Sequence, residues 1–123
     1  MLIAAFVILG TTVLLGSVLA VLHLRTDGAA APPWKLAALH GLLAIAGLSC
    51  LVLALRGPPR GLDQGTASFG IIAAALIALA ALFGAGFLAT HLLKRRVVGI
   101  LIGIHATLAV SGFVILAVYV LAG

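Results

Sequence analysis

Four octapeptides of this sequence pair a glycine with a histidine: GSVLAVLH at residues 16–23, HGLLAIAG at 40–47, GAGFLATH at 84–91 and HATLAVSG at 105–112. Each octapeptide lies inside a long apolar stretch, and together they contain every histidine of the chain. The order alternates between glycine first and histidine first, and this alternation occurs twice. Tandem repetition of one helical hairpin produces such a pattern. We place the two copies at about residues 1–56 and 67–122.

Apolar residues make up 65% of the 123-residue chain, against seven basic and two acidic residues. A water-soluble domain carries about a quarter charged residues, so this composition predicts an integral membrane protein. Four apolar stretches of about 20 residues or more are each long enough to span a bilayer as a helix. We expect a single transmembrane domain over residues 1–123, with helices at about 2–24, 35–55, 68–93 and 97–121.

The links between the predicted helices favour an up-down-up-down bundle. Pro32 and Pro33 precede the second helix, and proline is tolerated in the first turn of a helix. The loop RGPPRGLDQGT at residues 56–66 cannot continue that helix through two prolines. The link at residues 94–96 is so short that the third and fourth helices must be antiparallel neighbours. The predicted fold class is therefore all-α, a four-helix membrane bundle of two tandem hairpins related by a pseudo-twofold axis.

Basic residues are distributed unevenly between the two ends of this bundle. An even number of spans puts both termini on one side, together with Arg56 and Arg60. The opposite side carries five basic residues: Arg25, Lys35, Lys94, Arg95 and Arg96. Cytoplasmic loops of membrane proteins carry the excess of lysine and arginine. We therefore expect a multi-pass protein of the cell (inner) membrane with both termini outside, the histidine-rich end toward the cytoplasm, and no nucleic-acid partner.

The four histidines are predicted to form two diagonal pairs. His23 and His91 end the first and third helices, whereas His40 and His105 lie early in the second and fourth. In an up-down-up-down bundle, alternate helices lie across the diagonal from each other. Because helical side chains tilt toward the N-terminus, the rings on antiparallel helices approach a common depth. Two imidazoles that face each other at one depth meet the requirement for bis-histidine ligation of a haem iron.

The glycines and the rim cations are the remaining candidate binding residues. Each glycine lies about two helical turns, roughly 10 Å, from the histidine of its octapeptide and on the same stripe of the helix. Lacking side chains, these glycines are expected to leave a slot for a planar ligand: Gly16, Gly47, Gly84 and Gly112. Three basic residues at the rim are expected to pair with haem propionates: Arg25, Lys35 and Arg95.

His40 and His105 in HGLLAIAG and HATLAVSG, with His23 and His91 as a second diagonal, give the chain a resemblance to a family of membrane b-type cytochromes, the cytochrome b561-like group. The resemblance implies haem b and electron transfer to or from a quinone or another redox partner. Two-haem members of that group hold their haems near opposite membrane faces, whereas all four histidines here lie toward one face. We therefore expect one haem held by His40 and His105, with His23 and His91 as donors to propionate or water. The reverse assignment stays open.

Two other functions fit the same residues. The chain would be a non-catalytic structural or assembly subunit of a larger membrane complex if the glycines pack helices and the histidines are interfacial. Alternatively, the four imidazoles would bind copper or zinc. Carboxylate acid–base catalysis is excluded, because Asp27 and Asp63 are the only carboxylates of the sequence and both lie in loops. An electron-transfer subunit is thus favoured over a self-contained enzyme.

Overall fold

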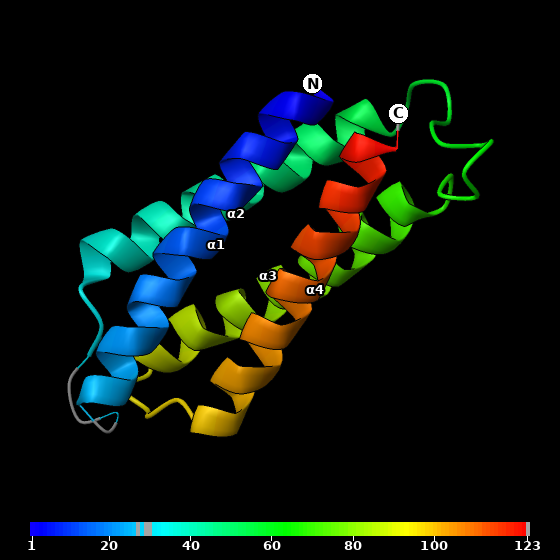
Figure 1. The fold of residues 1–123 in the computed structure, drawn as a ribbon. Coiled ribbons are helices and arrows are strands. Elements are labelled where there is room, and N and C mark those ends of the chain that lie inside the picture. The colour runs from blue at the N-terminus through cyan, green and yellow to red at the C-terminus, as the bar shows by residue number, and fades with distance from the viewer. Residues whose placement is uncertain (27, 29–30, 123) are drawn as a thin grey trace.

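The computed structural model describes residues 1–26, 28 and 31–122, and this part of the chain folds into four helices and no strand (Figure 1). The helices are α1 (Leu2–Arg25), α2 (Trp34–Ala54), α3 (Phe69–Leu92) and α4 (Gly99–Leu121). Each one is long and apolar enough to cross a membrane and to contact a lipid bilayer, which indicates a multi-pass membrane protein. The predicted all-α bundle of four spanning helices is confirmed, and each helix bound lies within two residues of its predicted position.

Proline and main-chain hydrogen bonds set the helix ends beside the two short links. Pro33 is the N-cap of α2, and its carbonyl accepts the N–H of Ala37 at 3.0 Å. At the other link, Lys94 adopts a left-handed conformation with φ 54°, and the N–H of Arg95 donates to the carbonyl of Thr90 at 2.9 Å. This arrangement is the usual way to end a helix with a left-handed residue. It ends α3 and turns the chain toward α4.

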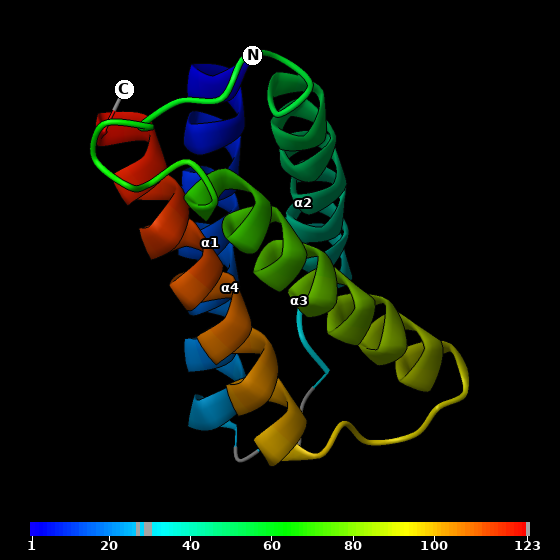
Figure 2. The same cartoon turned by 90° about the vertical axis from the view of Figure 1, so that its right-hand side faces the viewer.

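The helices pack as two hairpins, α1 with α2 and α3 with α4. The hairpins meet along α1 and α4 and along α2 and α3, and both termini lie at one end of the bundle (Figure 1). Figure 2 shows that α3 diverges from α4 toward the opposite end. That opposite end carries the links at residues 26–33 and 93–98 and is called the cationic end below.

The core occupies only the half of the bundle near the termini. Equivalent residues of the two repeats are fully buried in it, Ala5 with Ala73 and Leu51 with Leu116, all at 0% exposure. No described residue from 13 to 46 or from 81 to 111 is buried. The bundle therefore has a closed half near the termini and an open half toward the cationic end.

Gly47 and Gly112 mark the boundary of the closed half and pack directly against the neighbouring helix of their own hairpin. A Cβ at Gly47 would lie 2.7 Å from Cγ of Leu9, and one at Gly112 would lie 2.8 Å from Cγ1 of Ile77. Real Cβ atoms do not approach that closely, so the absent side chain is what lets the helices touch. Contrary to the expectation from the sequence, these two glycines border side chains rather than a ligand slot.

Replacing Gly112 with alanine should destabilise the bundle by about 1–3 kcal/mol, because overpacking a tight contact forces neighbouring groups apart. Gly103→Ala on the same helix is the matched control, since a Cβ there meets nothing within 4 Å. Titration with SDS in detergent micelles, followed by circular dichroism, measures both. Equal stability of the two variants would show that Gly112 is not a packing position.

Candidate functional site

His40 of α2 and His105 of α4 approach each other in the open half of the bundle. Their ring centroids are 6.1 Å apart and the ring planes are inclined at 69°. The two residues occupy equivalent positions of the repeat, on helices that make no backbone approach to each other. The contact between the two imidazole rings therefore joins the two hairpins across the diagonal of the bundle.

Each of these two rings is fixed by a hydrogen bond to the main chain of the other helix in its hairpin. Nδ1 of His40 lies 3.0 Å from the carbonyl oxygen of Thr12, and Nδ1 of His105 lies 2.8 Å from that of Ala80. A carbonyl oxygen only accepts, so Nδ1 carries the proton and donates it in both rings. In the neutral imidazole the other nitrogen, Nε2, is then left with a free lone pair.

Gly16 and Gly84 give the rings access to those carbonyls. In an α-helix the residue four positions after a carbonyl lies one turn above it, and Gly16 and Gly84 hold that position relative to Thr12 and Ala80. A Cβ on Gly16 would lie 2.9 Å from Cε1 of His40, and one on Gly84 would lie 3.6 Å from Cε1 of His105. Gly16 therefore makes room for the histidine of the next helix, whereas at Gly84 an alanine side chain would also fit beside His105, and neither glycine faces the histidine of its own octapeptide.

His23 and His91 do not join this pair. His23 is half-buried at the end of α1, where a Cβ on Gly28 would lie 3.1 Å from its Cε1, and His91 is exposed at the end of α3. Within residues 1–26, 28 and 31–122, no three side chains of the ligating types His, Cys, Asp and Glu are grouped closely enough to hold a metal ion. The structure thus assembles two of the four imidazoles and leaves the other two at the cationic end.

The rim cations proposed from the sequence are solvent- or headgroup-facing. Arg25, Lys35 and Arg95 are all exposed at the cationic end, and Nζ of Lys35 lies 6.0 Å from the ring centroid of Trp34. Arg96, which the sequence did not single out, lines a cavity between α3 and α4. The basic residues therefore surround the end of the bundle that lies nearer to His40 and His105.

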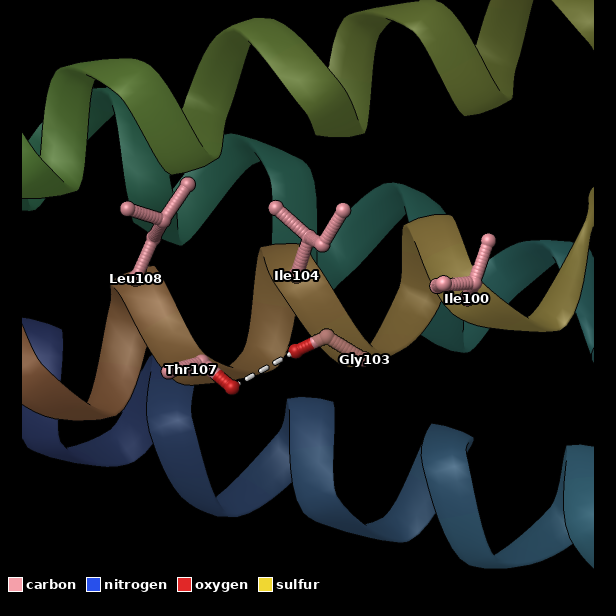
Figure 3. A pocket seen from close by; sticks show the side chains of 5 residues that line it. All are labelled: Ile100, Gly103, Ile104, Thr107 and Leu108. Carbon is pink, nitrogen blue, oxygen red and sulfur yellow. Dashed lines mark hydrogen bonds between the residues drawn. The ribbon is translucent and has the colours of Figure 1, made fainter.

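A cavity of about 400 Å³ opens along α4, and neither His40 nor His105 is among its lining residues. Figure 3 shows Ile100, Ile104 and Leu108 rising from one face of this helix on the side of α3. The hydroxyl of Thr107 donates to the carbonyl of Gly103 at 2.8 Å, so the polar group of the lining is satisfied within the helix. This cavity is therefore an apolar hollow on α4, separate from the two imidazoles.

Phe87 is a site residue that sequence reasoning missed. Its ring centroid lies 5.4 Å from that of His105, with the planes at 66°. The equivalent residue of the first repeat is Leu19, so only His105 has an aromatic neighbour of this kind. The one signal for Phe87 in the sequence was its place three residues after Gly84, and the carbonyls of Thr12 and Ala80 had no signal at all.

Comparison of the chain with protein-family models, with curated proteins and with solved structures gave no match.

Replacing Gly16 with alanine should break the His40–Thr12 hydrogen bond, because the new Cβ would overlap the imidazole. The Gly84→Ala substitution serves as the matched control, since 3.6 Å is an ordinary contact distance and His105 stays in place. Histidine-selective ¹⁵N NMR in micelles reports the Nδ1–H tautomer of each ring. A loss of about 1 kcal/mol of stability should accompany the Gly16 change alone. An unchanged His40 signal in Gly16→Ala would contradict this role of the glycine.

Proposed function

We propose that this protein is a small membrane b-type cytochrome, or a haem-carrying subunit of a larger complex, in which His40 and His105 are the two axial ligands of one haem. The observation that carries the proposal is the pair of imidazoles 6.1 Å apart across the bundle, each with its Nδ1 committed to a carbonyl. Haem b held in this way supplies a one-electron iron centre whose two axial sites are filled, which favours electron transfer over oxygen binding.

The spacing of the two rings supports a shared metal ion. Imidazole nitrogen binds such ions at about 2.0–2.1 Å, so two imidazoles on opposite sides of one ion have their ring centres about 6 Å apart. The 6.1 Å between His40 and His105 agrees with that value.

The hydrogen bonds to Thr12 and Ala80 support the same role. Histidines that bind a metal usually donate the other ring N–H to a carbonyl or carboxylate, which fixes the tautomer and the ring orientation and raises the basicity of the ligating nitrogen. Both rings have such a partner here, at 3.0 and 2.8 Å. Since the main chain of a neighbouring helix is the acceptor, each ring position is set by the packing of its hairpin.

Room for the macrocycle comes from the open half of the bundle. No described residue of that half is buried. The exposed cations Arg25, Lys35 and Arg95 lie at the same end, where propionates would meet them. His23 and His91 remain as donors near that rim, and one haem is proposed because these two do not form a second pair.

The proposed role is electron transfer without bond chemistry by the protein itself. The described residues place no carboxylate among the spanning helices, so the chain supplies no acid or base beside the imidazoles. The redox partner would be a quinone in the bilayer or a protein docked at the cationic end. We place the protein in the cell (inner) membrane, and the positive-inside rule supports an orientation with both termini outside and the cationic end toward the cytoplasm.

A structural or assembly subunit is the second candidate, because the histidine hydrogen bonds themselves join α1 to α2 and α3 to α4. In that case the rings would stabilise the hairpins and bind nothing. In the metal-binding alternative, copper or zinc would be held by the two imidazoles of His40 and His105 rather than by all four histidines.

Exchanging His40 or His105 for alanine should abolish haem binding, whereas His23→Ala and His91→Ala should retain it. The measurement is the reduced-minus-oxidised visible spectrum of protein produced with added haem, compared with elemental analysis for iron, copper and zinc. His105→Met keeps an axial ligand and should restore colour with a higher reduction potential, as expected for methionine ligation.

Colourless wild-type protein under these conditions would reject the cytochrome and leave the structural subunit. Copper or zinc at one ion per chain, without haem, would favour the metal-binding alternative. Loss of haem in the His23 and His91 variants, with His40→Ala still coloured, would assign the ligands to the other diagonal.

A further inference from the structure

A second cavity, of about 390 Å³, lies at the cationic end between α3 and the start of α4. Its lining is mostly apolar and includes Phe83, Phe87 and Leu101, with Gly86 adding no side chain. The other members are apolar apart from Thr90 and Arg96. An apolar groove with a cation at its mouth fits an amphipathic ligand with a negatively charged head.

Arg96 is the charged group of the lining that is free to bind such a head. The hydroxyl of Thr90 already donates to the carbonyl of Phe87 at 2.8 Å. The main-chain N–H groups of Lys94 and Arg95 are likewise used, since they donate to the carbonyls of His91 and Thr90 at 3.0 and 2.9 Å. Of these polar groups, the guanidinium of Arg96 is therefore the one that is available to an anion at this mouth.

The positive charge around the second cavity is not neutralised by acidic residues of the hairpin of α3 and α4. Lys94, Arg95 and Arg96 are consecutive, and the sequence has no Asp or Glu after Asp63, which lies in the loop at the other end of the bundle. The first hairpin differs, because its link at residues 26–33 has no run of cations. At the cationic end the sequence has five basic residues against one carboxylate, Asp27 of the other link, so a net positive charge remains there.

We propose that this cavity binds an anionic membrane phospholipid, with the phosphate on Arg96 and an acyl chain along Phe83, Gly86 and Leu101. The guanidinium group matches phosphate oxygens in a bidentate manner. Basic pockets between spanning helices at the membrane surface are a recurring site for anionic headgroups. The left-handed backbone of Lys94 ends α3, so the three consecutive basic residues 94–96 lie in the turn directly after that helix. The proposal is independent of haem binding.

Native mass spectrometry of the purified full chain in detergent tests the site, with phosphatidylglycerol and phosphatidylcholine of equal acyl chains as probes. The wild type should retain phosphatidylglycerol roughly fivefold better than phosphatidylcholine, and Arg96→Gln should remove most of this preference. Gly86→Leu should reduce retention of phosphatidylglycerol without changing charge, because its side chain would occupy the acyl groove while its Cβ meets no protein atom within 4 Å.

Lys94→Gly and Arg95→Gln are the matched controls. Each removes one charge from the same turn without touching the cavity lining, and glycine favours the positive φ that Lys94 adopts. Both should keep most of the preference for phosphatidylglycerol. Equal retention of the two lipids by the wild type would overturn the proposal. So would equal losses in the three charge variants, which indicate diffuse surface attraction, or an unaffected Gly86→Leu.

Discussion

The hydrogen bond from an imidazole N–H to a main-chain carbonyl, made once in each hairpin, is the interaction on which the site depends. A polar ring inside a membrane is costly unless its N–H is satisfied, and a helix carbonyl is available only where no side chain covers it. Gly16 keeps the carbonyl of Thr12 uncovered, and Gly84 occupies the equivalent position beside the carbonyl of Ala80, where the small alanine side chain would also fit. The glycine, the carbonyl and the histidine therefore form one unit that spans two helices, and duplication has placed two such units face to face.

One half of the bundle forms the packed core, and the other half contains the proposed ligand sites. Near the termini, buried pairs such as Leu51 and Leu116 interlock, and Gly47 and Gly112 let the helices touch. Toward the cationic end α3 diverges from α4 (Figure 2), and no described residue from 13 to 46 or from 81 to 111 is buried. A fold built this way can keep its core while the other half takes up the proposed ligands, the haem between His40 and His105 and the lipid beside Arg96.

Much of the fold could be predicted from the sequence because the signals are local. Long apolar stretches define the helices, Pro33 fixes where α2 begins, and the short link after α3 makes α3 and α4 neighbours. The spacing of glycine and histidine also drew attention to His40 and His105, which the structure brings together, and to Gly16, which adjoins His40. It did not identify their partners.

The partners depend on how each helix is rotated about its own axis, and these helices are apolar on all faces, so no stripe marks the inward side. Gly47 was therefore expected to border a slot, whereas it packs on Leu9. Main-chain acceptors such as the carbonyl of Ala80 have no sequence signature, and Phe87 resembles any other aromatic residue of a spanning helix.

Electron paramagnetic resonance of the oxidised protein, purified after production with added haem, tests most directly whether His40 and His105 share one iron. Two imidazole ligands predict a low-spin ferric signal at one iron per chain. A high-spin signal, or protein that contains no haem at all, would contradict the shared ligation.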